Sequence, residues 1–306
     1  MLECLDYKVL KSEDSILINV NNWVYPSGLS IQKISGKASI SYITKALDCH
    51  YVSDVFKEYT DSTINKGDYI LLTRVASEVA SMRSYDLGDG QKYFNVPIQQ
   101  VLGTFKNNDI SLDSLEMLYN KILIEKIDTN QTGLLLSGDN NMIGKILKVG
   151  TIGLDESYNP KPLRVKQGDV VIVKDNVSTE IRLGDKDYYA VEETHVVGVI
   201  SYGFSIDDIT FINDSILMVP YNNPKVLNSS LLITPDINYE DLDYSDIYNR
   251  DLFQVKYVDK ELKDVEVGDV LLVKRDYTNY VYLNQEKYFL LNGQKWIETK
   301  IIKEKE

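Results

Sequence analysis

Apolar runs that follow a Gly-Asp pair recur three times along the chain. They read GDYILL from Gly67, GDVVIV from Gly168 and GDVLLV from Gly268. Gly-Asp favours a tight turn, and a short run rich in Ile, Val and Leu after it is typical of a buried strand. Because the three copies are spaced by roughly one hundred residues, they predict an internal repeat.

Two further strand-like segments flank each Gly-Asp turn. Before it come the segments DSILINV, NKILIEK and DSILMVP, which alternate or are continuously apolar and begin at Asp14, Asn120 and Asp214. After it come the paired aromatic residues of KYFNV, DYYAV and KYFLL, which suit a half-buried sheet face. If the register holds, Ile16, Ile122 and Ile216 occupy equivalent positions in the first strands.

Domain boundaries are predicted in two short polar linkers, KNNDISLDS and SYGFSIDDIT. They divide the chain into repeats of residues 1–107, 108–205 and 206–306. Helical periodicity is sparse, and the best helical candidates are short pieces at residues 51–59 and 111–119. The expected fold class is therefore all-β, with three tandem domains.

Composition narrows the classes of partner. The 306 residues carry a formal net charge of -13, which disfavours nucleic acid and anionic membrane surfaces because both are bound through Lys and Arg. The chain has two cysteines, too few for a disulfide framework, so a reducing compartment is expected. The N-terminal residues do not resemble a signal peptide, and no run approaches the length of a transmembrane span.

Side chains that carry catalysis or hold metals are few. The spacings Cys-x-x-Cys and His-x-x-x-His are missing, and no G-x-G-x-x-G opens a helix after a strand. Cys49 and His50 are adjacent in an extended segment, so they should point to opposite faces. We therefore expect no enzymatic activity, no metal and no cofactor. The histidines and cysteines are His50, His195, Cys4 and Cys49.

The aspartates of the repeated turns, Asp68, Asp169 and Asp269, could be taken for a recurring set of metal ligands. Aspartate caps tight turns far more often than it binds metal. A turn-capping role is therefore predicted for all three.

The middle repeat carries a family resemblance. It contains IGKILKVG at Ile143–Gly150, KPLRVKQGD at Lys161–Asp169 and the closing strand VVGVI, in that order. In these segments it resembles the GroES, or chaperonin-10, co-chaperonin family along its whole length, and the first and third repeats resemble it more loosely. The resemblance implies three tandem GroES-like partly open β-barrels that bind other proteins and have no active site.

The resemblance also implies docking residues. In that family, a flexible loop after the first long strand carries a short apolar motif that binds the chaperonin rim. The alternative is that these residues belong to ordinary strands, which is favoured in the first and third repeats and stays open in the second. The matching positions are Gly133, Leu134, Leu135 and Leu136, then Gly28, Leu29 and Ile31, and then Leu231, Leu232 and Ile233.

Tyrosines alternate with acidic residues in NYEDLDYSDIYNRDLF of the third repeat. Tyrosine is favoured at protein interfaces because it combines a large contact area with a polar tip. Tyr239, Tyr244 and Tyr248 are therefore interface candidates, with a solvated loop as the alternative.

Two functions follow for a non-catalytic protein-binding chain. The first is a bacteriophage virion component, such as a capsid auxiliary protein, located in the virion or the host cytoplasm. It is favoured because three domains per chain cannot form a sevenfold ring. The roof hairpin of the family is also expected to be lost from the third repeat, and the abundant Asn, Ile, Lys and Tyr suggest an AT-rich genome. The second is a functional co-chaperonin that caps a chaperonin ring, and in both cases a homo- or hetero-oligomeric assembly is expected.

Overall fold

A computed structural model describes residues 15–23, 42–50, 64–86, 88–128, 141–154, 160–174, 178–183, 186–201, 206–221, 250–274, 279–283, 286–293 and 297–301. The chain divides into two compact units. The first contains residues up to Lys126 together with Lys145–Gly168 and Val177–Glu193. The second contains Ile127–Gly144, Asp169–Asn176 and the residues from Thr194 onward.

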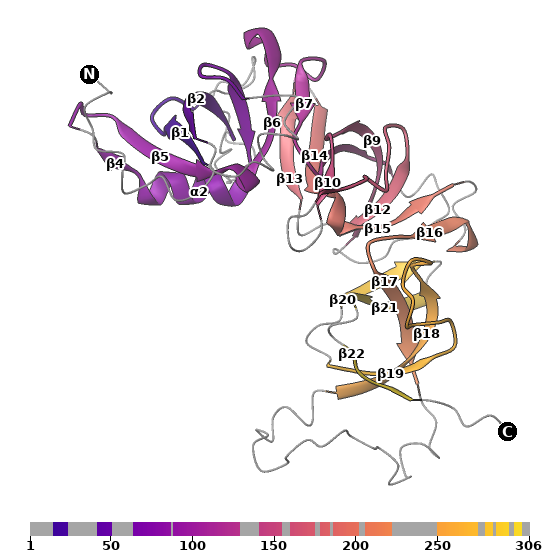
Figure 1. The fold of residues 1–306 in the computed structure, drawn as a ribbon. Helices are drawn as coiled ribbons and strands as arrows, with labels where there is room; N and C mark the ends of the chain where they lie inside the picture. The colour runs from indigo at the N-terminus through magenta and orange to yellow at the C-terminus, as the bar shows by residue number, and fades with distance from the viewer. Residues whose placement is uncertain are drawn as a thin grey trace, which may run out of the picture. The chain divides into compact units, whose positions relative to one another are not determined.

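The described strands form three larger antiparallel sheets and one short hairpin (Figure 1). None of the three sheets closes into a barrel within the described residues. The first sheet has the order β4-β5-β1-β2-β3-β6-β7, and all of it lies in the first unit. Its strands are β1 (Ser15–Asn19), β2 (Ile43–His50), β3 (Tyr69–Leu72), β4 (Tyr85–Asp86), β5 (Lys92–Pro97), β6 (Val101–Phe105) and β7 (Leu115–Met117).

The middle sheet repeats this arrangement in the order β13-β14-β8-β9-β12-β15-β16. Its strands begin with β8 (Lys121–Lys126) and β9 (Asn141–Val149). The others are β12 (Val170–Lys174), β13 (Thr179–Leu183), β14 (Lys186–Glu192), β15 (Val196–Ile200) and β16 (Ile209–Phe211). A separate two-stranded hairpin lies between β9 and β12 along the chain and consists of β10 (Gly153–Leu154) and β11 (Pro160–Lys161).

The third sheet lies in the second unit and has the order β20-β21-β17-β18-β19-β22. Its order matches the first six strands of the other two sheets. Residues 259–269, which connect β18 to β19, form turns and contain no strand. Its strands are β17 (Ser215–Pro220), β18 (Arg250–Val258), β19 (Val270–Lys274), β20 (Asn279–Leu283), β21 (Glu286–Asn292) and β22 (Ile297–Ile301).

The predicted strand register is confirmed at the first strands and at the turns. Ile16, Ile122 and Ile216 pair with Val96, Val191 and Leu291 of the aromatic strands. Gly67, Gly168 and Gly268 have φ values of 97°, 93° and 95°, a left-handed backbone that favours glycine. Each of these glycines donates its N–H to a backbone oxygen of the second strand, at Ala46, Ile146 and Val255. The three sheets therefore share the same glycine turn and the same hydrogen bond from that turn to the second strand.

Two helical expectations need correction. The segment predicted as helical at residues 111–119 contains β7, because Leu115 and Met117 pair with Phe105 and Gly103 of β6. Among the described residues of the first unit, one α-helix, α2 (Arg74–Arg83), lies directly after β3 and was not predicted. Residues 51–59 lie outside the described residues. The short 3₁₀ turns are η3 (Ile98–Gln100), η4 (Lys106–Asn108), η7 (Glu193–His195) and η8 (Ile206–Asp208).

A fully buried carboxylate supports the turn that opens the third sheet. Asp259 accepts hydrogen bonds from the backbone N–H groups of Asp214 at 3.0 Å and Glu261 at 3.1 Å. Asp214 has a φ of 54°, an uncommon conformation that this contact helps to hold.

We expect Asp259→Ala to lower the free energy of unfolding by about 2–3 kcal/mol, because it deprives two backbone donors of a buried acceptor. Urea denaturation followed by circular dichroism measures the loss. Asp259→Asn keeps one acceptor oxygen and should lose less than alanine does. Equal stability of the alanine variant and the parent would show that the carboxylate does not support the turn.

Candidate protein-binding site

The predicted docking residues all fall in one kind of connection. In each sheet this connection joins the first strand to the second, after β1, β8 and β17. Every docking and interface candidate named from the sequence lies outside the described residues, so their roles stay predictions. These are Gly28, Leu29, Ile31, Gly133, Leu134, Leu135, Leu136, Leu231, Leu232, Ile233, Tyr239, Tyr244 and Tyr248.

The described residues locate where the connections after β8 and β17 leave their sheets. In the middle sheet, the backbone N–H of Ile127 donates to Ile143 O at 2.9 Å. In the third sheet, the N–H of Tyr221 donates to Leu252 O at 2.8 Å. Both bonds continue the ladder past the end of the first strand, so the two ends of each connection are held side by side.

A buried polar network fixes the segment KPLRVKQGD of the middle repeat. Glu193 is buried and accepts a hydrogen bond from the Arg164 N–H at 2.8 Å, while its own N–H donates to Asn120 O at 2.7 Å. The Arg164 segment is thereby tied to the residues that open β8. The motif therefore has a structural role: it holds the start of β8, the strand that precedes the predicted docking residues of the middle sheet.

An ion pair joins β8 to β14 beside this network. The Lys121 ammonium is buried and pairs with the Glu192 carboxylate, which is partly exposed. Burial lowers the pKa of Lys121, and the negative charge of Glu192 opposes that shift. Glu192 thus supplies the counter-charge for Lys121, the first residue of β8, the strand that precedes Leu134–Leu136 in the chain.

The residues considered above as catalytic or metal-binding candidates make packing and turn-capping contacts where the structure describes them. Cys49 packs against the hydrophobic cluster of the first sheet. Asp68 accepts from the Asn65 N–H at 2.9 Å and Asp269 from the Glu266 N–H at 2.8 Å, so the turn-capping prediction is confirmed for both. In the described part of the chain, no three His, Cys, Asp or Glu side chains gather to hold a metal ion.

Among the residues that the structure describes, no helix is both long enough and apolar enough to cross a membrane.

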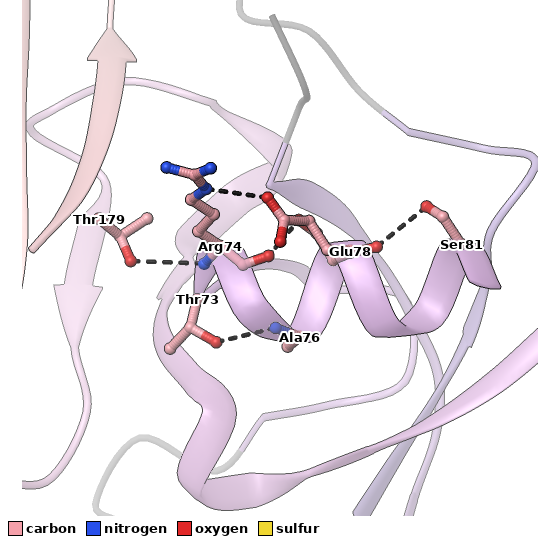
Figure 2. Close-up of polar contacts among 7 residues, drawn as sticks. Thr73, Arg74, Ala76, Glu78, Ser81 and Thr179 are labelled. Carbon is pink, nitrogen blue, oxygen red and sulfur yellow. Dashed lines mark hydrogen bonds and ion pairs between the residues drawn. The ribbon is translucent and has the colours of Figure 1, made fainter. Parts of the chain in front are cut away.

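Helix α2 is a surface feature that the sequence did not reveal. Thr73 caps it by accepting a hydrogen bond from the Ala76 N–H at 3.2 Å, and Arg74 pairs with Glu78 at 2.8 Å (Figure 2). The Arg74 N–H donates to Thr179 Oγ1 of β13 at 3.4 Å. Ala76 and Ala80 face the core, whereas Val75 and Met82 are 62% and 76% exposed. The helix therefore presents two apolar side chains to solvent.

Sheet order, the three glycine turns and the hairpin β10-β11 define a class of protein: an antiparallel β scaffold that carries long connections after its first strands. Residues 114–200, from β7 through β15, match the family model described as "Chaperonin 10 Kd subunit". The chain belongs to this chaperonin-10 family through residues 114–200.

Several relatives are similar to a part of the chain of comparable length. A "Co-chaperonin GroES" of Orientia tsutsugamushi is 30% identical over 89 residues, which are 28% of this chain and 95% of the relative. "Co-chaperonin GroES" of Aquifex aeolicus (strain VF5) is 29% identical over 28% of this chain and 76% of its own length. The "10 kDa chaperonin, mitochondrial" of Arabidopsis thaliana is 26% identical over 27% of this chain and 89% of its own length.

Proposed function

We propose that the chain is a non-catalytic, co-chaperonin-like protein that docks on a chaperonin ring through the connection between β8 and β9. The observation that carries the proposal is the family match over residues 114–200, which spans the strands on both sides of that connection. The relatives bear the names co-chaperonin and 10 kDa chaperonin. These names support the second of the two functions drawn from the sequence.

The proposal extends to all three repeats. The shared strand orders and the shared left-handed glycines support three tandem GroES-like domains, each with a connection of the same kind. Several weak docking segments on one scaffold bind with a higher effective concentration than one segment alone. Once one segment is bound, the binding of the other two becomes intramolecular, so the affinity of the whole chain would exceed that of any single segment.

We expect the purified chain to bind a double-ring bacterial chaperonin only in the presence of ATP, and we expect Leu135→Asp/Leu136→Asp to abolish binding. Two leucines buried in a groove contribute about 3–6 kcal/mol, so their loss should weaken binding by more than about a hundredfold. Co-migration with the ring in gel filtration and titration by calorimetry measure the effect. Circular dichroism checks that the fold survives.

A matched control is available on α2. Val75→Asp/Met82→Asp also places two charges at exposed apolar positions but leaves the docking connection intact, so it should bind like the parent chain. If the Leu135/Leu136 variant instead unfolds, these leucines belong to a strand core. Absence of any nucleotide-dependent binding by the unmodified chain would reject the proposal and leave a virion role and a location in the virion as the prediction to test.

A further inference from the structure

The first two sheets are each extended by a strand from the next repeat. At the end of the first sheet, Gly103 and Thr104 of β6 pair with Met117 and Glu116 of β7. At the end of the middle sheet, Gly198 of β15 pairs with Phe211 of β16 in the same way. We use the term joint for this contact between a closing strand and the added strand. Both joints have the same register.

The glycine in each joint is required by close approach and not by backbone conformation. A Cβ on Gly103 would lie 2.6 Å from Glu116 O, a backbone atom of the added strand. A Cβ on Gly198 would lie 2.6 Å from Ile209 Cγ2 and 3.1 Å from Thr210 O. A side chain at this position therefore displaces the added strand.

The residue before each glycine fills the core between successive repeats. Leu102 and Val197 are 2% and 0% exposed. Leu102 belongs to a cluster that includes Leu115 of β7 and Ile181 of β13. The corresponding cluster around Val197 contains residues of β16, β20 and β21. A charged residue at either position would place its charge in an apolar cluster, which is costly.

The third sheet has different residues at all three joint positions. The pairs Leu71↔Gly103, Ile172↔Gly198 and Leu272↔Thr299 are equivalent, and each is followed by the same register shift. The triplets Leu-Gly-Thr and Val-Gly-Val of the first two joints thus become Glu-Thr-Lys at residues 298–300. A β-branched residue replaces glycine, and charged residues lie on both sides of it.

The surroundings of β22 differ in the same direction. In the described strands, β22 has β19 as its one neighbour. The Lys300 ammonium lies 2.7 Å from Asp269 Oδ2 and donates to Asp264 O at 3.3 Å, so it is bound within its own repeat. Leu252 pairs with Leu272 as Ile43 pairs with Leu71, so Leu252 and Ile43 hold corresponding positions. Ile43 is buried, whereas Leu252 is only half-buried. Within the described part of the chain, this face lacks the cover that a further repeat supplies elsewhere.

We infer that β22 is a terminal edge of its sheet, built so that no further strand is added beside it. Charges, Lys above all, are a common means by which an edge strand is protected from pairing. Repeat proteins likewise need end repeats with a polar outer surface. Copies of this chain therefore do not join head to tail through the third repeat. The inference is independent of chaperonin docking.

Restoring the joint tests the inference directly. Light scattering after gel filtration should give the parent protein a mass that does not grow with concentration, the mass of one chain being 35.0 kDa. The variant E298V/T299G/K300V copies the Val-Gly-Val of the middle sheet, and its mass should rise with concentration to that of two chains or more. A variant that stays at one chain would show that these residues do not close the edge. The inference also fails if the parent self-associates and K300E disperses the assembly.

The reciprocal variant V197E/G198T/V199K places the terminal triplet into a working joint. It should release β16, so that protease cuts the chain between residues 201 and 208, while the parent resists under the same conditions. The single variant V199K serves as a control, because it leaves the glycine and the buried Val197 in place. Equal resistance of the triple variant and the parent would contradict the assigned role of the triplet.

Discussion

Replacing Gly150 with alanine is expected to prevent the middle sheet from folding. A Cβ at Gly150 would lie 1.9 Å from Tyr119 O and 2.7 Å from Tyr119 C. Both are backbone atoms, and the Gly150 N–H already donates to Lys121 O at 2.7 Å, so neither segment can move away cheaply. We expect a loss above about 4 kcal/mol, which belongs to the small class of severely destabilising substitutions.

Thermal unfolding by circular dichroism measures the effect, and hydrogen exchange locates it. Thr151→Ala is the matched control, because Thr151 is the next residue and is exposed. The control should change stability by less than about 0.5 kcal/mol. If Gly150→Ala unfolds at the same temperature as the parent, the close approach of Tyr119 is not a constraint on the native chain.

Much of the fold was predictable because its signals are local. The Gly-Asp turns and the apolar runs after them need only near neighbours in sequence, and the structure places β3, β12 and β19 there. The aromatic segments likewise became β5, β14 and β21. The corresponding places of these strands in the three sheets could be predicted, since three copies of one pattern carry more information than any single copy.

The elements that were missed depend on distant contacts. The segment 111–119 has apolar spacing that suits a short helix, but its partner is the edge of the preceding sheet, and pairing with β6 decides its conformation. Helix α2 has the sequence RVASEVASMR, in which valine and serine give only weak helix propensity. Its capping by Thr73 and burial of Ala76 and Ala80 stabilise it, and neither shows as a strong pattern in the sequence.

The binding site was predictable only as a position in the chain order. A resemblance can identify the connection that follows a first strand, but the residues that hold its ends lie far apart in sequence, as do Tyr221 and Leu252. The terminal edge was harder still. Residues 298–300 acquire meaning only when the paired strands show that Thr299 stands opposite Leu272, at the position where the other two sheets have a glycine. Polar residues near a chain terminus carry no such message by themselves.

Phe105→Ala is expected to lower the free energy of unfolding by about 3–5 kcal/mol, because a buried phenyl ring leaves a cavity that the sheet cannot close. Phe105 is fully buried and pairs with Tyr69 and Leu115 on its two sides. It also belongs to the cluster that includes Ile181 and Leu183 of β13. The cavity should therefore weaken the first joint as well as the first sheet.

The two effects can be separated by hydrogen exchange at single residues during native-state unfolding. If Phe105 supports the joint, the amides of β7 should exchange faster in the variant, in step with those of β6. Met82→Ala removes a side chain of similar hydrophobicity from an exposed site and should change stability by less than about 0.5 kcal/mol. Faster exchange in β6 with unchanged exchange in β7 would show that the added strand is held without Phe105, and that the joint rests on the glycine and on Leu102 alone.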